Sequence, residues 1–305
     1  MAAEVSFTVD TPRGPRALSV RYERRGAGEP LLLLHGIGIG HHWQAWEPVL
    51  DVLARERDVI AADLPGFGAS GALPDGLAYG PATVVPALGA LCAALGVDRP
   101  HVAGNSLGGL LALGMGRAGL ARSVTALSPA GFWSEGERRY AFATLRVMRL
   151  VARALPVPLI GRLSRSAAGR VALTGAVYAR PARRSPEAVV AETPALRTAA
   201  GFEETLAAGR GVPYREDVPG VPVTIAWGTR DRLLLPRQGV RARGVLPGAR
   251  LVRLPGCGHV PMHDDPALVA RVVLDGSGGR AGRRAHPGRG AAAPDTTAVE
   301  GPAHP

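Results

Sequence analysis

Short, uninterrupted apolar segments alternate with longer helical segments, and this alternation restricts what the chain can fold into. Leu31 to Leu34 is such an apolar run, and it ends at His35-Gly36, as a central strand buried on both faces would. Further strands are expected at 58–62, 100–103 and 123–127, with helices near 46–55 and 83–95 and another beginning just after Ser106. Such alternation is typical of a parallel sheet covered by helices on both sides. We therefore predict an α/β fold with a mostly parallel, doubly wound sheet.

The alternation is interrupted once. No strand is apparent from about residue 133 to 217, where the sequence indicates several amphipathic helices, and strand-like segments return at 223–227 and 250–254. We expect a core formed by residues 1–132, which open with a hairpin, and by residues 218–275. The segment 133–217 is then a helical cap inserted into that core.

The last part of the chain has a different composition. Residues 276–305 consist mainly of Gly, Ala, Pro and Arg. Such a segment cannot bury enough apolar area to offset the entropy that it loses on ordering. We expect a disordered C-terminal tail there.

The overall composition is that of a globular protein, with 46% hydrophobic and 20% charged residues. Cys92 and Cys257 lie far apart in the sequence, which argues against a disulfide framework. The N-terminus carries acidic residues early and lacks the apolar segment of a secretory signal. No apolar run reaches the roughly 18 residues of a membrane span. A reduced, cytoplasmic setting is expected, and nothing in the sequence specifies an oligomeric state.

The net charge of +11 comes entirely from arginine, because the chain contains no lysine. No aromatic-interleaved basic motif or recognition helix accompanies the charge, so we expect no nucleic-acid partner. Eleven arginines and no acidic residue lie between Arg138 and Arg184, interleaved with apolar stretches. This segment could attract an anionic membrane surface or acidic acyl substrates. The lysine-free composition favours the alternative, a solvated arginine face on helices that pack over the site.

Gly104-Asn105-Ser106-Leu107-Gly108 matches the pattern G-x-S-x-G between a predicted strand and a predicted helix. In that context the serine lies on a sharp, strained turn, and side chains at 104 or 108 would collide. Its hydroxyl is then exposed at a helix N-terminus, where negative charge is favoured. The alternative is an ordinary helix N-cap. The strand-turn-helix context favours Ser106 as a nucleophile.

A serine hydroxyl needs a base, and histidine has a suitable pKa. His259 follows the last predicted strand on a glycine loop, at the strand end where sites in open α/β sheets gather. Asp231 follows the penultimate strand, and the chain order serine, acid, histidine is that of the hydrolases. The alternatives are His263 as the base, and a turn role for Asp231 beside its neighbouring arginines.

A tetrahedral intermediate needs hydrogen-bond donors for its oxyanion. The backbone amides of Leu107, after the nucleophile, and of Ile37, after the first central strand, are the candidates. A phosphate-binding role for the glycine loop that begins at Gly36 is disfavoured, because the chain has no lysine to complete a P-loop. We expect neither a cofactor nor a metal.

Assembled in this order, the motifs resemble those of the α/β-hydrolase superfamily, in its cap-bearing branch of esterases and meta-cleavage-product C–C hydrolases. The resemblance covers roughly residues 17–275, with these matches: His35-Gly36, Asp63 to Gly68, Gly104 to Gly109, Trp227 to Asp231, and Gly258-His259. It implies an α/β-hydrolase fold and makes Asp63 to Gly68 a structural loop near the site. The serine at position 106 disfavours the epoxide hydrolases and haloalkane dehalogenases of the same fold, which use aspartate.

The resemblance implies a serine hydrolase that cleaves a carboxylic ester with a small or medium apolar acyl group. The alternative is C–C bond hydrolysis of a vinylogous diketone. Asn105 beside the nucleophile and Pro236 after Asp231 resemble the residues of the C–C hydrolases at these positions. Val260 departs from that pattern, because many C–C hydrolases carry tryptophan after the histidine. A non-catalytic binding protein of this fold is a third hypothesis, which the presence of all three triad residues disfavours.

Overall fold

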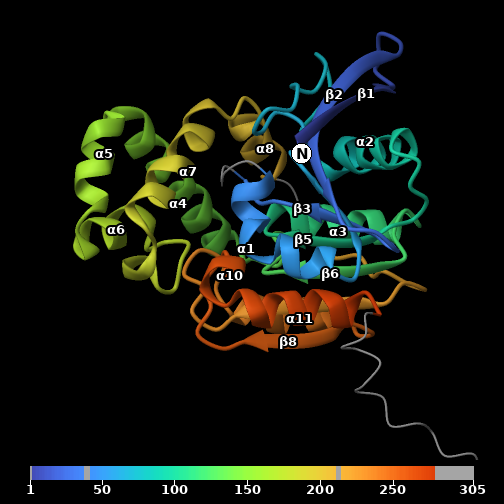
Figure 1. The fold of residues 1–305 in the computed structure, drawn as a ribbon. Helices are drawn as coiled ribbons and strands as arrows, with labels where there is room; N and C mark the ends of the chain where they lie inside the picture. Colours follow the sequence, from blue (N-terminus) through green and yellow to red (C-terminus); the bar gives the residue numbers. More distant parts are fainter. Residues whose placement is uncertain (1, 38–41, 211–213, 279–305) are drawn as a thin grey trace, which may run out of the picture.

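The computed structural model describes residues 2–37, 42–210 and 214–278, and its centre is a sheet of eight strands (Figure 1). The strand order is β1-β2-β4-β3-β5-β6-β7-β8. Their bounds are Ala2–Val9 (β1), Arg16–Arg25 (β2), Pro30–Leu34 (β3), Asp58–Ala62 (β4), His101–Asn105 (β5), Ser123–Leu127 (β6), Val223–Gly228 (β7) and Arg250–Leu254 (β8). Strands β3 to β8 run parallel, whereas β1 and β2 form an antiparallel hairpin whose second strand pairs with β4. The predicted mostly parallel sheet is confirmed.

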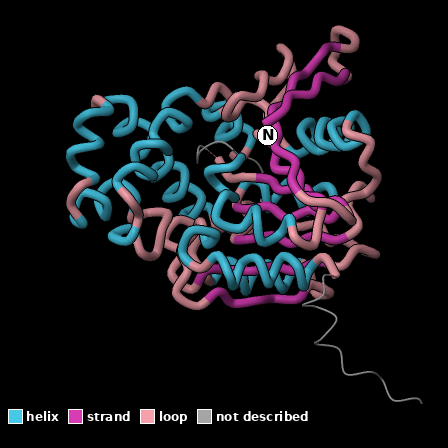
Figure 2. Tube along the Cα trace, viewed as in Figure 1, coloured by secondary structure: helices cyan, strands magenta, loops and turns pink. Residues whose placement is uncertain are grey.

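Helices cover both faces of this sheet (Figures 1 and 2). Those of the core are α1 (His42–Ala54), α2 (Pro81–Ala94), α3 (Leu107–Arg117), α9 (Arg237–Val245), α10 (Pro261–Asp264) and α11 (Pro266–Gly276). Helix α1 packs against α11, and α2 packs against α3. Helices α9, α10 and α11 are not among those predicted from the sequence.

The strand order reverses at β3, and this reversal locates the site. The chain passes from β3 to β4 on one side and then returns to β5 on the other side of β3. Right-handed crossovers then send α1 and α2 to opposite faces of the sheet. A crevice is left at the carboxyl ends of β3 and β5, which is where ligands bind in open α/β sheets.

Burial explains why the central segments form strands. Every residue of β4, β5, β6 and β7 is buried, as are Leu31 to Leu34 of β3. Strands that are buried along their whole length have to be covered on both faces. The edge strand β1 instead alternates between exposed and half-buried side chains, as a strand with one solvated face should.

Between β6 and β7 the chain forms a group of helices that we call the cap. These are α4 (Glu135–Ala154), α5 (Val157–Ser164), α6 (Ala167–Thr174), the 3₁₀ turn Pro181–Arg183, α7 (Pro186–Thr198) and α8 (Phe202–Ala208). Helix α4 begins at Ser134 with a capping box: the Ser134 side chain accepts from the Glu137 amide, and the Glu137 carboxylate accepts from the Ser134 amide. Helices α5 and α6 lie at the end of the cap that is farthest from the sheet (Figure 1).

The described chain extends beyond the boundary at which we expected the tail. Gly276 is the last residue of α11, and Ser277 is buried. The Arg57 guanidinium donates to the Ser277 carbonyl oxygen at 2.6 Å, so these residues are fixed to the start of β4. Residues 279–305 of the predicted tail lie outside the described residues.

Candidate active site

Ser106 lies on a strained turn between β5 and α3. Its backbone angles are φ 57° and ψ −115°, which a residue with a side chain rarely adopts. A Cβ atom at Gly104 would come within 2.1 Å of the Gly108 carbonyl oxygen, and one at Gly108 within 2.1 Å of the Leu34 carbonyl oxygen. The two glycines therefore let the turn close against β3 and hold the serine at the crevice.

His259 and Asp231 meet at the carboxyl ends of β7 and β8. The His259 ring nitrogen Nδ1 lies 2.9 Å from Asp231 Oδ2, and both side chains are buried. The other oxygen, Asp231 Oδ1, accepts from the amides of Leu233 at 2.9 Å and Leu234 at 2.8 Å. Because the carboxylate is held on both oxygens, it can fix the imidazole in the tautomer that keeps Nε2 as a base.

Asn105 connects the Ser106 turn to the His259 loop. Its side-chain amide donates to the Leu127 carbonyl oxygen at 3.0 Å and to the His259 carbonyl oxygen at 2.9 Å. Among the hydrogen bonds of the described residues, the Ser106 hydroxyl and the His259 ring are not joined. Hydrogen bonds of this kind are often long in unliganded enzymes and tighten when substrate binds.

The two backbone amides proposed for the oxyanion come directly after the strands that flank the crevice, one after β3 and one after β5. Leu107 is the first residue of α3, where amides have no partner within the helix. Ile37 follows Gly36, and a Cβ atom at Gly36 would lie 3.1 Å from the Ser106 Cβ atom. The loop after β3 therefore contacts the serine directly.

A cavity of about 610 Å³ lies between this edge of the sheet and the cap. Ser106, Ile37 and Leu107 all line it. Cap residues that face them across the cavity are Trp133, Ala141, Phe142, Leu145, Leu206 and Gly209. A mainly apolar cavity of this size beside a serine suits a small or medium organic substrate.

His263, the alternative base, and His35, at the end of β3, make structural contacts. His35 is buried, with Nδ1 2.7 Å from the Gly36 carbonyl oxygen and Nε2 accepting from the Leu64 amide at 2.9 Å. His263 lies on α10, where its Nδ1 is 2.6 Å from Arg184 Nη1 and its ring meets Tyr178 edge-on. His41 and the side chain of His42 lie outside the described residues.

A family model described as the alpha/beta hydrolase fold matches residues 29–266. The chain belongs to this family. Its relatives and its fold make it an enzyme, a hydrolase.

Relatives of this hydrolase include proteins with several activities. An uncharacterised protein of Mycobacterium tuberculosis is 28% identical over 262 residues, covering 81% of this chain and 75% of the relative. An epoxide hydrolase of the same organism is 26% identical over 194 residues, covering 59% of this chain and 86% of the relative. A 2-hydroxy-6-oxo-2,4-heptadienoate hydrolase of Pseudomonas putida is 44% identical over 89 residues, covering 29% of this chain and 32% of the relative.

Solved structures show the same fold. An esterase from Thermogutta terrifontis superimposes with a TM-score of 0.68 at 22% identity, covering 90% of this chain and 97% of that one. A serine hydrolase involved in carbazole degradation gives a TM-score of 0.67 at 22% identity, covering 90% of this chain and 99% of that one.

Two contacts that hold the His259 loop of the hydrolase are not apparent from the sequence. The Val177 carbonyl oxygen, in the cap, accepts from the His259 amide at 2.8 Å. The Asp264 carboxylate accepts from the amides of Gly258 at 2.8 Å, and of Ala179 and Arg180 at 3.1 Å each. The sequence shows two adjacent acidic residues after His263, but it does not indicate that the first of them binds amides of the cap.

Within the described ranges, no group of three or more His, Cys, Asp or Glu side chains is arranged to hold a metal ion. A helix long and apolar enough to cross a membrane is also absent from that part of the chain.

Proposed function

We propose that this hydrolase cleaves carboxylic esters through a covalent acyl-enzyme formed on Ser106. The observation that carries the proposal is the 2.9 Å contact between His259 Nδ1 and Asp231 Oδ2. It is supported by the strained turn of Ser106, whose neighbour Asn105 donates to the His259 carbonyl oxygen. A histidine oriented by a buried carboxylate is the base that a serine nucleophile requires.

In the proposed reaction His259 Nε2 takes the proton of the Ser106 hydroxyl as the oxygen attacks the ester carbonyl carbon. The carbonyl oxygen becomes an oxyanion, which the amides of Ile37 and Leu107 stabilise. The imidazolium, balanced by Asp231, then gives its proton to the leaving alcohol as the ester bond breaks. In the second half His259 takes a proton from water as the water oxygen attacks the acyl carbon. The bond to Ser106 Oγ then breaks, the imidazolium returns its proton to Oγ, and the acid is released.

The cavity supports a small or medium apolar acyl group as the substrate class. Its lining around Ser106 is mainly apolar, and its volume is about 610 Å³. Apolar side chains recognise an acyl group by burying it, and they provide little discrimination between neighbouring chain lengths. We therefore expect activity on a range of acyl chains.

A second candidate is hydrolysis of a C–C bond in a vinylogous diketone. The Pseudomonas putida relative, whose name describes such a substrate, is 44% identical over 89 residues. In this chain the Asn105 amide is engaged by two backbone carbonyl oxygens, which gives it a structural role. We therefore prefer ester hydrolysis.

The test labels the protein with a fluorophosphonate and maps the modified peptide. We expect stoichiometric labelling of Ser106 in the wild type and none in Ser106→Ala. His259→Ala should lower kcat on p-nitrophenyl esters by about four to six orders of magnitude, as in other triads. His263→Ala is the matched control, and it should retain most of the rate.

A folded wild type that is not labelled would refute the proposal. Turnover of a dienol ring-fission product that equals or exceeds turnover of the esters would select C–C hydrolysis instead. A His259→Ala variant with a nearly normal rate would show that the base lies elsewhere.

A further inference from the structure

The exposed apolar side chains of this protein are concentrated on the cap. Ten large hydrophobic side chains in the described part of the chain are exposed, and eight of them lie between Tyr140 and Val171. These eight are Tyr140, Val147, Leu150, Val151, Val157, Leu159, Leu163 and Val171, and we call them the cap patch. Single exposed hydrophobic residues are normal, whereas a cluster of this kind marks an interaction surface.

Helix α4 carries the patch on the side opposite to its packed side. Ala141, Phe142 and Leu145 are buried, and all three line the substrate cavity. Val147 and Leu150 are 58% and 66% exposed. Because the patch residues of α4 recur at helical spacing, they form one continuous stripe. The stripe faces solvent, so it does not contribute to packing α4 against the rest of the protein.

Arginines border the stripe. Arg139, Arg146 and Arg153 recur every seven residues, which places them in a row along one side of it. Two of them pair with single carboxylates, Arg139 with Glu135 and Arg146 with Glu203.

Further arginines and the absence of acidic residues leave the surface positive. Arg162 and Arg165, at the end of α5, are exposed beside Leu163. No acidic residue occurs between Arg138 and Arg184. Five arginines border the patch, whereas the carboxylates paired with them are Glu135 and Glu203, so the charge around the cap patch is positive overall.

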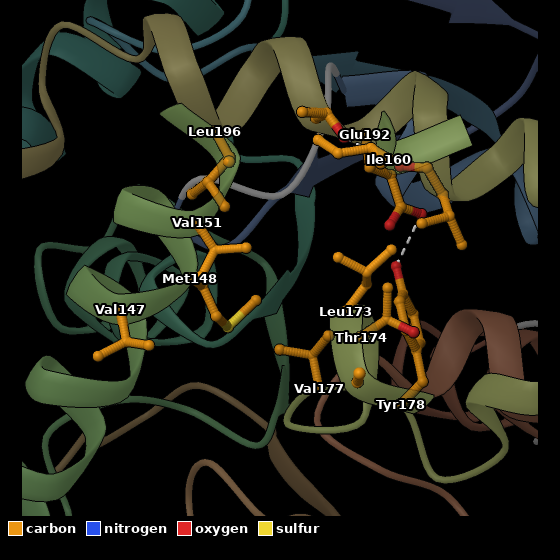
Figure 3. Close-up of a pocket in the computed structure, with 14 residues that line it drawn as sticks. Val147, Met148, Val151, Ile160, Leu173, Thr174, Val177, Tyr178, Glu192 and Leu196 are labelled. Carbon is orange, nitrogen blue, oxygen red and sulfur yellow. Dashed lines mark hydrogen bonds between the residues drawn. The ribbon is translucent and has the colours of Figure 1, made fainter. Parts of the chain in front are cut away.

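The patch adjoins an apolar pocket within the cap (Figure 3). Val147 and Val151, which belong to the patch, also line this pocket, together with Met148, Leu173 and Val177 from the cap interior. Since two of its lining residues are exposed, the pocket opens on the cap patch. The apolar surface therefore extends from the side chains of α4 into the interior of the cap.

We propose that the cap patch docks on the surface of a lipid bilayer that contains anionic headgroups. The apolar side chains enter the boundary between headgroups and acyl chains, and the arginines contact the lipid phosphates. A bilayer fits both features, because stable peripheral binding needs an apolar contribution and a basic one together. This surface is separate from the proposed ester-hydrolysing site.

The test sediments the full chain with vesicles of phosphatidylcholine alone, or of phosphatidylcholine mixed with phosphatidylglycerol. We expect the wild type to sediment with the mixed vesicles and much less with phosphatidylcholine alone. The double variant Val147→Ser with Leu150→Ser should lower the partition coefficient by about tenfold or more. Arg162→Glu with Arg165→Glu should lower it by at least about tenfold as well.

Control variants carry the same changes on an element outside the cap. Val240 of α9 is 69% exposed, and Arg243 lies on the same helix. Val240→Ser and Arg243→Glu should sediment as the wild type does. All variants should hydrolyse a soluble short-chain p-nitrophenyl ester at the wild-type rate, which shows that they are folded.

A wild type that stays in the supernatant with the mixed vesicles would overturn the proposal and point to a protein partner. Binding that salt abolishes but that the Val147 and Leu150 changes leave intact would overturn the apolar contact. Light scattering that finds a dimer which Leu150→Ser dissociates would assign the patch to a second copy of the chain.

Discussion

The position of the Ser106 hydroxyl depends on two residues that have no side chain. The Gly108 carbonyl group occupies the space where a Cβ atom of Gly104 would lie, and the Leu34 carbonyl group occupies the space where a Cβ atom of Gly108 would lie. The sequence motif was sufficient to predict this need, because glycine is required wherever backbone segments approach so closely. The motif does not reveal that β3, through Leu34, is the surface against which Gly108 packs.

We expect Gly108→Ala to destabilise the protein by about 1–3 kcal/mol and to lower kcat, since its Cβ atom would displace β3 or the turn. Urea unfolding and ester turnover measure both effects. Gly244 of α9 is the matched control, because a Cβ atom there would meet nothing within 4 Å. Gly244→Ala should be neutral or stabilise the helix by up to about 1 kcal/mol. Equal stability of the two variants would contradict the predicted collision.

At the scale of elements, Glu137 attaches the first cap helix to a helix of the core. Its carboxylate closes the capping box of α4 and also pairs with Arg237 and Arg241 of α9. Burial raises the pKa of Glu137, but hydrogen bonds from the Ser134 amide and from Arg237 outweigh burial, and the pKa lies below its ordinary value. The entry of the chain into the cap is therefore held by a carboxylate that has to be ionised.

A lowered pKa means that the folded state binds fewer protons than the unfolded chain. The contribution of Glu137 to stability is therefore complete above the ordinary pKa of 4.5 and is lost as the pH falls below it. We expect Glu137→Gln to lower the free energy of unfolding at neutral pH by about 1–3 kcal/mol. The difference from the wild type should shrink in urea titrations below pH 4.5, and Glu187→Gln on α7 should show neither effect.

An element could be predicted well when residues close together in the sequence determine it, and poorly when contacts with distant residues do. β6 and β8 have the predicted bounds, because a short apolar or β-prone run between turns is a local signal. In the cap only the existence of helices was predictable. Arg149 shows why, since it is buried against Phe202 and donates to the Ala199 carbonyl oxygen. The hydrophobic periodicity of the sequence cannot predict such contacts.

At the scale of the whole molecule, Asp264 joins the cap to the candidate site. It accepts from Gly258 in the His259 loop and from Ala179 and Arg180 in the cap. The candidate triad could be inferred from motif order along the chain. The Asp264 contacts could not, because Ala179 and Arg180 lie 85 and 84 positions from Asp264 in the sequence, and what they offer it is a backbone amide, which every residue except proline has.

We expect Asp264→Asn to lower the free energy of unfolding by about 1–3 kcal/mol, since one acceptor oxygen becomes a donor that faces an amide. Because Asp264 positions the His259 loop without lining the substrate cavity, kcat should fall while KM changes little. Asp75→Asn, at an exposed site, is the control and should change neither. A variant with lowered stability and an unchanged kcat would restrict Asp264 to holding the fold.

The hydrogen bond from the His259 amide to the Val177 carbonyl oxygen bears on how such enzymes diversify. A cap that is inserted between two strands can be replaced by another cap while the sheet is kept, and the new cap would change the substrate range. Here the inserted segment also supports the loop of the candidate base, so a transplanted cap that lacks an equivalent carbonyl would change substrate range and turnover together. Engineering of this scaffold should therefore graft cap helices that precede residue 177 and leave 177–180 in place.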